Sequence, residues 1–255
     1  MSDKPPIIMI TGATAGFGEA TARCFANAGW RLILTGRRQQ RLEKLQAELG
    51  GPEQVHICAF DISDRKATET AINAIPPAFS DIDVLVNNAG LALGLDPAHE
   101  THLDDWERMV DTNIKGLMRC TRLLLPKMVE RGQGYIINIG SVAGNWPYPG
   151  GNVYGATKAF VRQFSLALRA DLLGTGVRVS NIEPGNAETE FSIIRFKENT
   201  ERADKLYANT QALTAQDIAD TIFWLVSTPK HVNVTTLEIM PTQQANGPFA
   251  IYRSE

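Results

Sequence analysis

Cysteine is scarce in this chain, whose 255 residues contain only Cys24, Cys58 and Cys120. The three are widely spaced, none forms a Cys-x2-Cys pair, and an odd number cannot complete a disulfide framework. Two fall in helix-like patterns and one in a strand-like pattern, so buried packing is the expected role of each. The sequence therefore excludes a disulfide-stabilised secreted domain and fits a reducing compartment.

Long apolar runs and a strong net charge are missing as well. The apolar run before the first turn, 7–10, is too short for a signal-peptide core or a membrane span, and no other stretch approaches one. We therefore expect a cytoplasmic protein. The formal net charge of -3 gives no indication of a nucleic-acid or membrane-surface partner. His99 and His102 have a metal-like spacing, but no cysteine accompanies them, and we expect no bound metal.

Strand-length apolar runs alternate with longer helix-length patterns along the chain. The runs are rich in β-branched residues and nearly all apolar, as in strands covered on both faces. This alternation predicts an α/β fold in one domain, 1–255: a doubly wound, parallel, seven-stranded sheet (Rossmann fold) with helices on both faces. The expected strands are 7–11, 31–35, 55–60, 83–87, 135–140, 177–182 and 236–240. The expected helices lie near 17–28, 38–49, 64–75, 103–130, 153–173 and 215–227.

Polar residues near 186–213 break this alternation after the sixth strand. Segments after strand carboxyl ends flank the ligand crevice of an open α/β sheet. The stretch is therefore either a substrate lid or a pair of surface helices.

Three glycines lie where the first strand passes into a helix. Glycine lets the backbone approach a pyrophosphate, and a helix N-terminus favours its negative charge. A tight turn alone would need one glycine rather than three. The predicted nucleotide loop consists of Gly12, Thr14, Ala15, Gly16, Phe17 and Gly18.

The end of the second strand indicates which nucleotide binds. A fold that prefers NAD has an acid there for the ribose 2′-hydroxyl. This chain has Arg37 and Arg38, two guanidiniums that suit a phosphate and sit poorly at a helix N-terminus unless an anion is near. We therefore expect NADP(H).

Polar and small residues follow the next two strands. Asp61 and Ile62 come after the third strand, where Asp61 would either meet the adenine or cap the following helix. Asn88, Ala89 and Gly90 come after the fourth, where a ribose or nicotinamide could pass close. Both groups are predicted to contact the cofactor.

Tyr154 and Lys158 are four residues apart, so in a helix they share one face at about 5–6 Å between Cβ atoms. A phenol is a poor base at neutral pH, and a cation beside it lowers its pKa. The two could form a proton-transfer pair, with Ser141 orienting a substrate oxygen. A surface tyrosine and a solvated lysine are the alternative.

Taken together, these motifs resemble those of the short-chain dehydrogenase/reductase family. The matching residues span nearly the whole chain: TGATAGFG at 11–18, NNAG at 87–90, Asn113, Ser141, Tyr154, Lys158 and Pro184-Gly185. The resemblance is closer still to the NADP-dependent 3-hydroxy acid dehydrogenases, which also reduce malonic semialdehyde and oxidise serine or allo-threonine. It is carried by GSVAGNWPYPGGNVYGATKAFVRQFSL from Gly140, SIIRF from Ser192 and HVNVTTLEIMPTQQ from His231.

This resemblance implies a mechanism. Tyr154 would be the general acid in reduction and the general base in oxidation, with Lys158 lowering its pKa and binding the ribose. Ser141 would hold the substrate oxygen, and Asn113 would support a water that relays protons to Lys158. Further cofactor contacts would come from Pro184, Gly185, Thr189 and Phe191. Family members associate into homotetramers through the helices near 103–130 and 153–173.

A 3-hydroxy acid also needs a group that holds its carboxylate. Arg195 is the candidate, because a guanidinium can grip a carboxylate with two hydrogen bonds. Lys197 and Arg202 compete with it, and all three could be solvated instead. Trp146 and Tyr148 would either wall a small substrate pocket or pack a loop.

Two other functions are compatible with the same motifs. One is a reductase of other carbonyls, such as 3-ketoacyl thioesters. The other is a catalytically silent protein that senses NADP.

Overall fold

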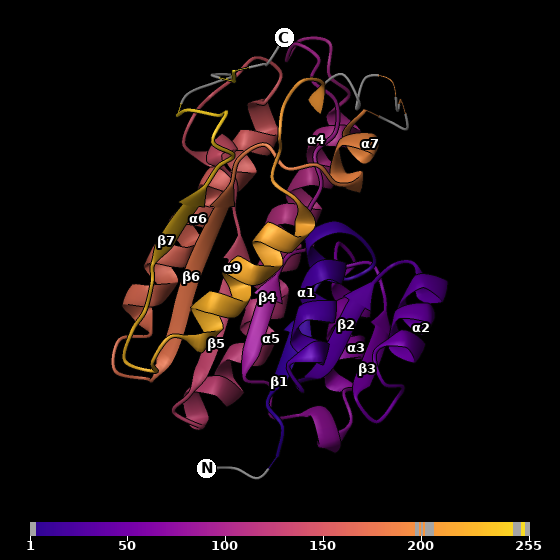
Figure 1. The fold of residues 1–255 in the computed structure, drawn as a ribbon, viewed down its shortest axis with the longest axis vertical. Helices are drawn as coiled ribbons and strands as arrows, with labels where there is room; N and C mark the ends of the chain where they lie inside the picture. Colours follow the sequence, from indigo (N-terminus) through magenta and orange to yellow (C-terminus); the bar gives the residue numbers. More distant parts are fainter. Residues whose placement is uncertain (1–3, 197–198, 200, 202–206, 247–250, 253–255) are drawn as a thin grey trace.

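In the computed structural model of the protein, the apolar, β-branched runs form the strands of one parallel sheet. The structure describes residues 4–196, 199, 201, 207–246 and 251–252. The strand order is β3-β2-β1-β4-β5-β6-β7, and every neighbouring pair is parallel (Figure 1). The strands are β1 (Ile7–Ile10), β2 (Arg31–Gly36), β3 (Val55–Ala59), β4 (Val84–Asn87), β5 (Gly134–Ile139), β6 (Val177–Pro184) and β7 (Thr236–Ile239). All seven predicted strands are confirmed, with ends that differ by up to two residues.

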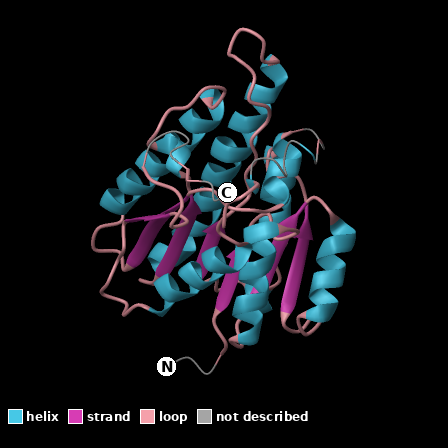
Figure 2. Cartoon of the chain, turned by 45° about the horizontal axis from the view of Figure 1, so that its top comes forward, coloured by secondary structure: helices cyan, strands magenta, loops and turns pink. Residues whose placement is uncertain are grey.

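Helices cover both faces of this sheet (Figure 2). Alternate residues of β1 separate the two sides, because Ile8 and Ile10 pack with α1, α2 and α9, whereas Ile7 and Met9 pack with α3, α5 and α6. The predicted doubly wound arrangement is therefore confirmed. The helices are α1 (Gly16–Asn27), α2 (Gln39–Glu48), α3 (Arg65–Asn73), α4 (Leu103–Val110), α5 (Leu117–Glu130), α6 (Asn152–Asp171), α7 (Glu190–Arg195) and α9 (Ala215–Ser227). Shorter helical turns are η1 (Pro77–Phe79), η2 (Asp111–Gly116) and η3 (Val142–Gly144).

The prediction of one continuous α-helix over 103–130 is wrong at its middle. A π-helical turn, η2, separates α4 from α5. Two contacts accompany the wider turn. The Asn113 side chain forms hydrogen bonds with the backbone of Leu91. Gly116 packs closely on Ile62, so that a Cβ added to Gly116 would lie 3.0 Å from Cγ1 of Ile62. Such turns are frequent at functional sites.

The predicted lid region contains one described helix, α7, close to the carboxyl end of the sheet (Figure 1). Residues 197–198, 200 and 202–206 lie outside the described part of the chain, and with them the candidates Lys197 and Arg202. Among the described residues, no helix combines the length and apolar character needed to span a bilayer.

A capping box begins α9, the helix that packs against α1. Thr214 Oγ1 accepts a hydrogen bond from Asp217 N at 3.3 Å, and Asp217 Oδ2 accepts one from Thr214 N at 2.7 Å. We expect Thr214→Ala to lower the free energy of unfolding by about 1 kcal/mol, because the backbone amide of Asp217 loses its hydrogen-bond acceptor. Urea denaturation measures this loss. Gln216→Ala on the same exposed turn is the matched control, and an equal loss in both variants would contradict the capping role.

Candidate active site

A cavity of about 430 Å³ lies at the carboxyl ends of the strands and contains nearly every predicted cofactor residue. Its walls include Gly12, Thr14, Ala15, Gly16, Phe17, Arg37, Arg38, Asp61, Ile62, Asn88, Ala89, Gly90, Tyr154, Lys158, Pro184, Gly185, Thr189 and Phe191. Gly18 does not line it. Sequence reasoning missed Thr35, Gly36, Phe60, Leu91, Thr112, Ile139, Gly140, Ala187, Glu190 and Ile194, most of which are apolar or carry no polar side chain.

The glycine loop is packed so closely that side chains would not fit. A Cβ on Gly18 would lie 2.4 Å from the carbonyl oxygen of Gly12, which explains Gly18 as a packing residue behind the cavity. Gly12 and Gly16 have φ values of 68° and 54°, which favour glycine. No side chain caps the N-terminus of α1 at Ala15, so its first N–H groups are available to an anion. This arrangement fits a dinucleotide pyrophosphate.

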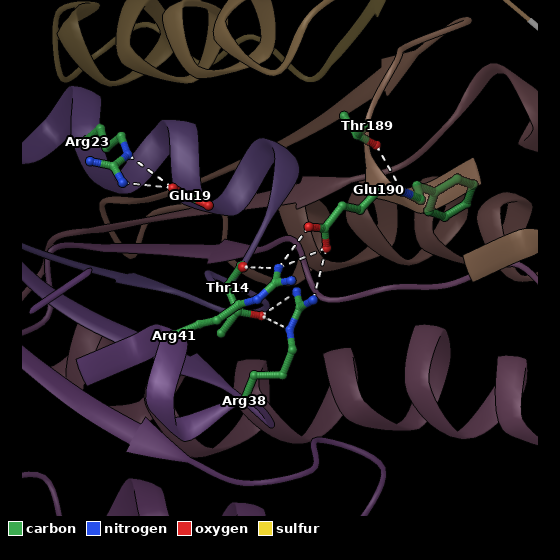
Figure 3. A network of polar contacts seen from close by, with 8 residues as sticks. Thr14, Glu19, Arg23, Arg38, Arg41, Thr189 and Glu190 are labelled. Atoms are coloured by element: carbon green, nitrogen blue, oxygen red, sulfur yellow. Dashed lines mark hydrogen bonds and ion pairs between the residues drawn. The ribbon is translucent and has the colours of Figure 1, made fainter. Parts of the chain in front are cut away.

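Charged groups gather at the end of β2, on the far side of the loop (Figure 3). Arg38 donates from Nε and Nη2 to Thr14 Oγ1 at 3.0 and 2.8 Å. Its Nη1 lies 2.9 Å from Glu190 Oε2, and Arg41 Nη1 lies 2.8 Å from Glu190 Oε1. Sequence reasoning missed Arg41, although its position one helical turn after Arg37 and Arg38 was a usable signal.

Arg37 is directed away from this group, toward Asp61. The two form an exposed ion pair with 3.6 Å between Nη1 and Oδ2. Asp61 also accepts hydrogen bonds from the backbone and hydroxyl of Ser63, whereas Asp64 caps α3 through Ala67 N at 2.9 Å. The alternative that Asp61 caps this helix is therefore wrong. Burial raises the pKa of Asp61, but the Ser63 hydrogen bonds and Arg37 outweigh it and lower the pKa overall.

Tyr154 and Lys158 lie on the inner face of α6, both buried. Lys158 Nζ donates to the carbonyl oxygen of Ile139 at 2.7 Å and lies 5.8 Å from the centre of the Tyr154 ring. Ser141 follows β5 and is hydrogen-bonded to Tyr154. A surface position for the pair, the alternative left open by the sequence, is therefore wrong.

The electrostatic environment of Tyr154 differs from the expectation. Burial raises the pKa of Tyr154 to about 12, and the cation that acts against this rise is Arg195, with a smaller contribution from the Ser141 hydrogen bond. Burial also lowers the pKa of Lys158 to about 8, so its charged form is itself disfavoured. Arg195 lies with its guanidinium carbon 5.1 Å from the Tyr154 ring centre. The structure thus adds a second cation to the predicted pair.

Asn113 is buried in the π-helical turn, with its side chain fully engaged. Its Oδ1 accepts from Leu91 N at 2.9 Å, and its Nδ2 donates to Leu91 O at 2.8 Å and Thr157 Oγ1 at 3.0 Å. A Cβ on Gly90 would meet both Asn113 Oδ1 and Lys158 Nζ, at 3.4 and 3.6 Å. Asn113 therefore fixes the wall of the cavity beside Lys158.

A second, smaller cavity of about 150 Å³ adjoins the first at Ser141 and Tyr154. The substrate-binding candidates Trp146, Tyr148 and Arg195 all line it. Arg195 Nη2 donates to the Tyr148 hydroxyl, which orients the guanidinium. The walls are completed by Val142, Ala143, Gly185, Asn186, Ala187, Phe191, Ser192, Tyr207, Gln244 and Ile251.

Two buried donors in these walls lack a hydrogen-bond partner within the described part of the chain. They are Arg195 Nε and Asn186 Nδ2. A buried donor without a partner costs free energy, so a ligand that supplies acceptor oxygens would be favoured here. A carboxylate provides such oxygens.

Comparison with known proteins agrees with this geometry. The family profile described as short chain dehydrogenase matches residues 6–200. The chain is 56% identical over 249 residues to the NADP-dependent 3-hydroxy acid dehydrogenase YdfG of Salmonella typhi, covering 97% of this chain and 100% of that protein. It is 56% identical over 246 residues to the serine 3-dehydrogenase of Agrobacterium fabrum (strain C58), covering 96% and 98%.

Solved structures show the same relationship. The closed form of serine dehydrogenase complexed with NADP+ superposes with a TM-score of 0.93 at 54% identity, covering 97% of this chain and 100% of that one. Serine dehydrogenase from Escherichia coli superposes with a TM-score of 0.82 at 51% identity, covering 94% and 99%. The resemblance derived from the motifs is confirmed, and the chain belongs to the short-chain dehydrogenase family.

Proposed function

We propose that the protein is an NADP-dependent oxidoreductase that transfers a hydride between NADP(H) and small 3-hydroxy acids or their semialdehydes. Candidate pairs include 3-hydroxypropionate with malonic semialdehyde, and the hydroxy amino acids serine and allo-threonine. One observation carries the proposal: a small cavity brings the Tyr154 phenol, the Ser141 hydroxyl and the Arg195 guanidinium together. A proton donor, an oxygen holder and a carboxylate holder are the groups this reaction needs.

The large cavity would hold the cofactor. The uncapped N-terminus of α1 would take the pyrophosphate, the arginines after β2 the adenosine phosphate, and Lys158 the nicotinamide ribose. When bound, NADP(H) supplies the hydride or accepts it. The protein supplies orientation and a route for the proton.

Tyr154 would transfer that proton at its phenolic oxygen. In reduction the phenol donates to the developing alkoxide, which Ser141 stabilises by hydrogen bonding. In oxidation the phenolate accepts the hydroxyl proton. The positive charge of Arg195 favours that phenolate against the effect of burial.

Lys158 would continue the proton route, because burial lowers its pKa to about 8 and so makes the release of a proton near neutral pH easier. Asn113 would support this route by fixing the cavity wall beside Lys158 Nζ. A water between the two groups remains a prediction. The predicted lid near 186–213 would close the substrate cavity, to which it contributes Arg195 and Tyr207.

Substrate size distinguishes the proposal from the reduction of 3-ketoacyl thioesters. A cavity of about 150 Å³ that contains a guanidinium suits a small carboxylate better than a pantetheine arm. The complete set of Asn113, Ser141, Tyr154 and Lys158 argues against a silent sensor, which needs no proton route.

Steady-state kinetics with both cofactors tests the proposed function. The substrates are 3-hydroxypropionate, L-serine and an acetoacetyl thioester. We expect saturable oxidation of the two acids with NADP+ and a clear preference for NADP+ over NAD+. Saturable turnover of the thioester alone would contradict the acid specificity, and no turnover of any substrate would contradict the enzymatic function.

We further propose a cytoplasmic homotetramer. Exposed apolar side chains on helices of both sheet faces support more than one interface between copies: Met118 and Val129 on α5, and Trp224 on α9. Light scattering coupled to size-exclusion chromatography should give four times the chain mass of 28.0 kDa. A monomer at micromolar concentration would contradict this assembly.

A further inference from the structure

Glu190, in the first turn of α7, reaches across the cofactor cavity to two arginines (Figure 3). Its carboxylate oxygens lie 2.8 and 3.0 Å from Arg41 Nη1 and 2.9 Å from Arg38 Nη1. The paired residues are 149 and 152 positions apart in the chain, so the contact exists only in the folded protein. Burial raises the pKa of Glu190, but the hydrogen bonds from Arg38 and Arg41 outweigh it and lower the pKa overall. Glu190 is therefore an anion at neutral pH.

The same two arginines also contact the nucleotide loop. Arg38 donates twice to Thr14 Oγ1, and Arg41 Nη1 lies 3.3 Å from the carbonyl oxygen of Thr14. Two guanidiniums thus converge on a single anion at the end of β2, and the Thr14 hydroxyl accepts hydrogen bonds from one of them. A phosphate monoester requires the same set of partners, because guanidinium groups present several N–H donors in a fixed fork.

Arg37 does not take part in this cluster, because it pairs with Asp61 instead. The neighbouring arginines therefore face different anions. Within the cluster, the second guanidinium comes from Arg41, which is on the first turn of α2. The sequence alone favoured Arg37 for this position.

We propose that Arg38 and Arg41 recognise the 2′-phosphate of the cofactor, and that Glu190 is the anion that this phosphate displaces from them. The inference rests on the proposed NADP(H) cofactor and goes beyond it. Glu190 would then set how much more tightly NADP(H) binds than NAD(H). NAD(H), which has no 2′-phosphate, would leave the carboxylate in place.

Charge balance supports displacement rather than sharing. Two guanidiniums carry two positive charges, and a phosphate monoester carries about -1.5 to -2 at neutral pH. The phosphate alone nearly neutralises the pair, whereas the phosphate and a carboxylate together would leave excess negative charge. The Glu190 side chain is 40% exposed, so its carboxylate can move into water.

Direct binding measurements by calorimetry test the proposal at one fixed salt concentration. The ligands are NADP+, NAD+ and adenosine 2′,5′-bisphosphate, and the proteins are the wild type, Glu190→Gln, Arg41→Ala and the double variant. We expect Glu190→Gln to bind NADP+ and the bisphosphate about tenfold more tightly, because two exposed ion pairs no longer compete. NAD+ affinity should not change. The matched control is Glu188→Gln, which removes the charge of an exposed glutamate two residues away. It should bind all three ligands as the wild type does.

Arg41→Ala should weaken NADP+ binding about tenfold and leave NAD+ binding unchanged. The gain from Glu190→Gln should also shrink in the Arg41→Ala background, because the two residues act through one contact. Unchanged or weaker NADP+ binding by Glu190→Gln would overturn the displacement, as would unchanged NADP+ binding by Arg41→Ala. A wild-type protein that binds NADP+ no more tightly than NAD+ would overturn both this inference and the proposed cofactor. A clear NADP+ preference that Glu190→Gln does not alter would overturn this inference alone.

Discussion

Tyr154→Phe should lower kcat by about 10² to 10⁴ in both directions, with little change in the affinity for NADP(H). The substitution removes one oxygen from a buried ring and leaves the ring's packing against Phe191 in place. In the proposed mechanism, the phenolic oxygen joins the substrate oxygen to the proton route. Without it, the alkoxide formed by hydride transfer keeps the hydrogen bond from Ser141 but loses the acid that would protonate it. Single-turnover kinetics and calorimetric titration with NADP+ separate the two effects.

A matched control for this variant is Tyr148→Phe. Tyr148 lines the same small cavity and contacts Arg195, but its hydroxyl is not on the proposed proton route. We expect a smaller loss that appears mainly in KM, because Arg195 loses an orienting partner. If Tyr154→Phe kept wild-type kcat, the proton route would be wrong. If both variants lost kcat equally, the phenolic oxygen of Tyr154 would have no special role.

Replacing Arg195 should have the second largest effect, because we propose that this guanidinium acts on the substrate and on Tyr154. Arg195→Gln should reduce kcat/KM for a 3-hydroxy acid by roughly 100-fold, which is the cost of removing one partner from a buried charge pair. For a neutral secondary alcohol of similar size, which has no carboxylate to hold, the loss should be much smaller. Arg195→Lys retains the positive charge but not the paired N–H donors of the guanidinium. Its kcat/KM for the 3-hydroxy acid should lie between the values of the wild type and Arg195→Gln.

The pH dependence of oxidation provides an independent readout for the same variants. Tyr154 must be a phenolate to accept the substrate proton, and the positive charge of Arg195 favours that form. Removing the charge raises the pKa of Tyr154, so the rising limb of the pH–kcat profile should move to higher pH in Arg195→Gln. In Arg195→Lys it should remain near the wild-type position. A profile that is unchanged in Arg195→Gln would show that Arg195 has no influence on the phenol.

The fold could be predicted from the sequence because its signals are local. Each strand is a short apolar run that is complete within itself, such as Ile7–Ile10, and the helices follow with their own periodicity. Strict alternation then restricts the topology to a doubly wound sheet. The π-helical turn at Asp111–Gly116 was not predictable in this way, because its packing partners, Leu91 and Ile62, come from other segments.

The site could be predicted where one short motif contains all the interacting residues. Tyr154 and Lys158 share a helix face, and the glycine loop occupies one turn. Sequence reasoning failed where charges from distant segments meet. The partner of Arg38 and Arg41 lies about 150 residues away on α7, and the cation nearest to the Tyr154 ring is Arg195 rather than the neighbour in the motif. Only the docking of α7 on the sheet brings these groups together.

The π-helical turn also has a consequence for the chain on either side of it. Met109 of α4 packs with Tyr154 and Leu91 in the active-site cluster, whereas Cys120 and Leu124 of α5 pack against the sheet. The wider turn rotates α5 about the helix axis relative to α4. Each helix therefore presents its apolar side to a different neighbour. An ordinary helix advances by about 100° per residue, so deleting one residue between 111 and 116 would rotate one side relative to the other by that angle. The shortened chain could keep the sheet contact or the active-site contact, but not both.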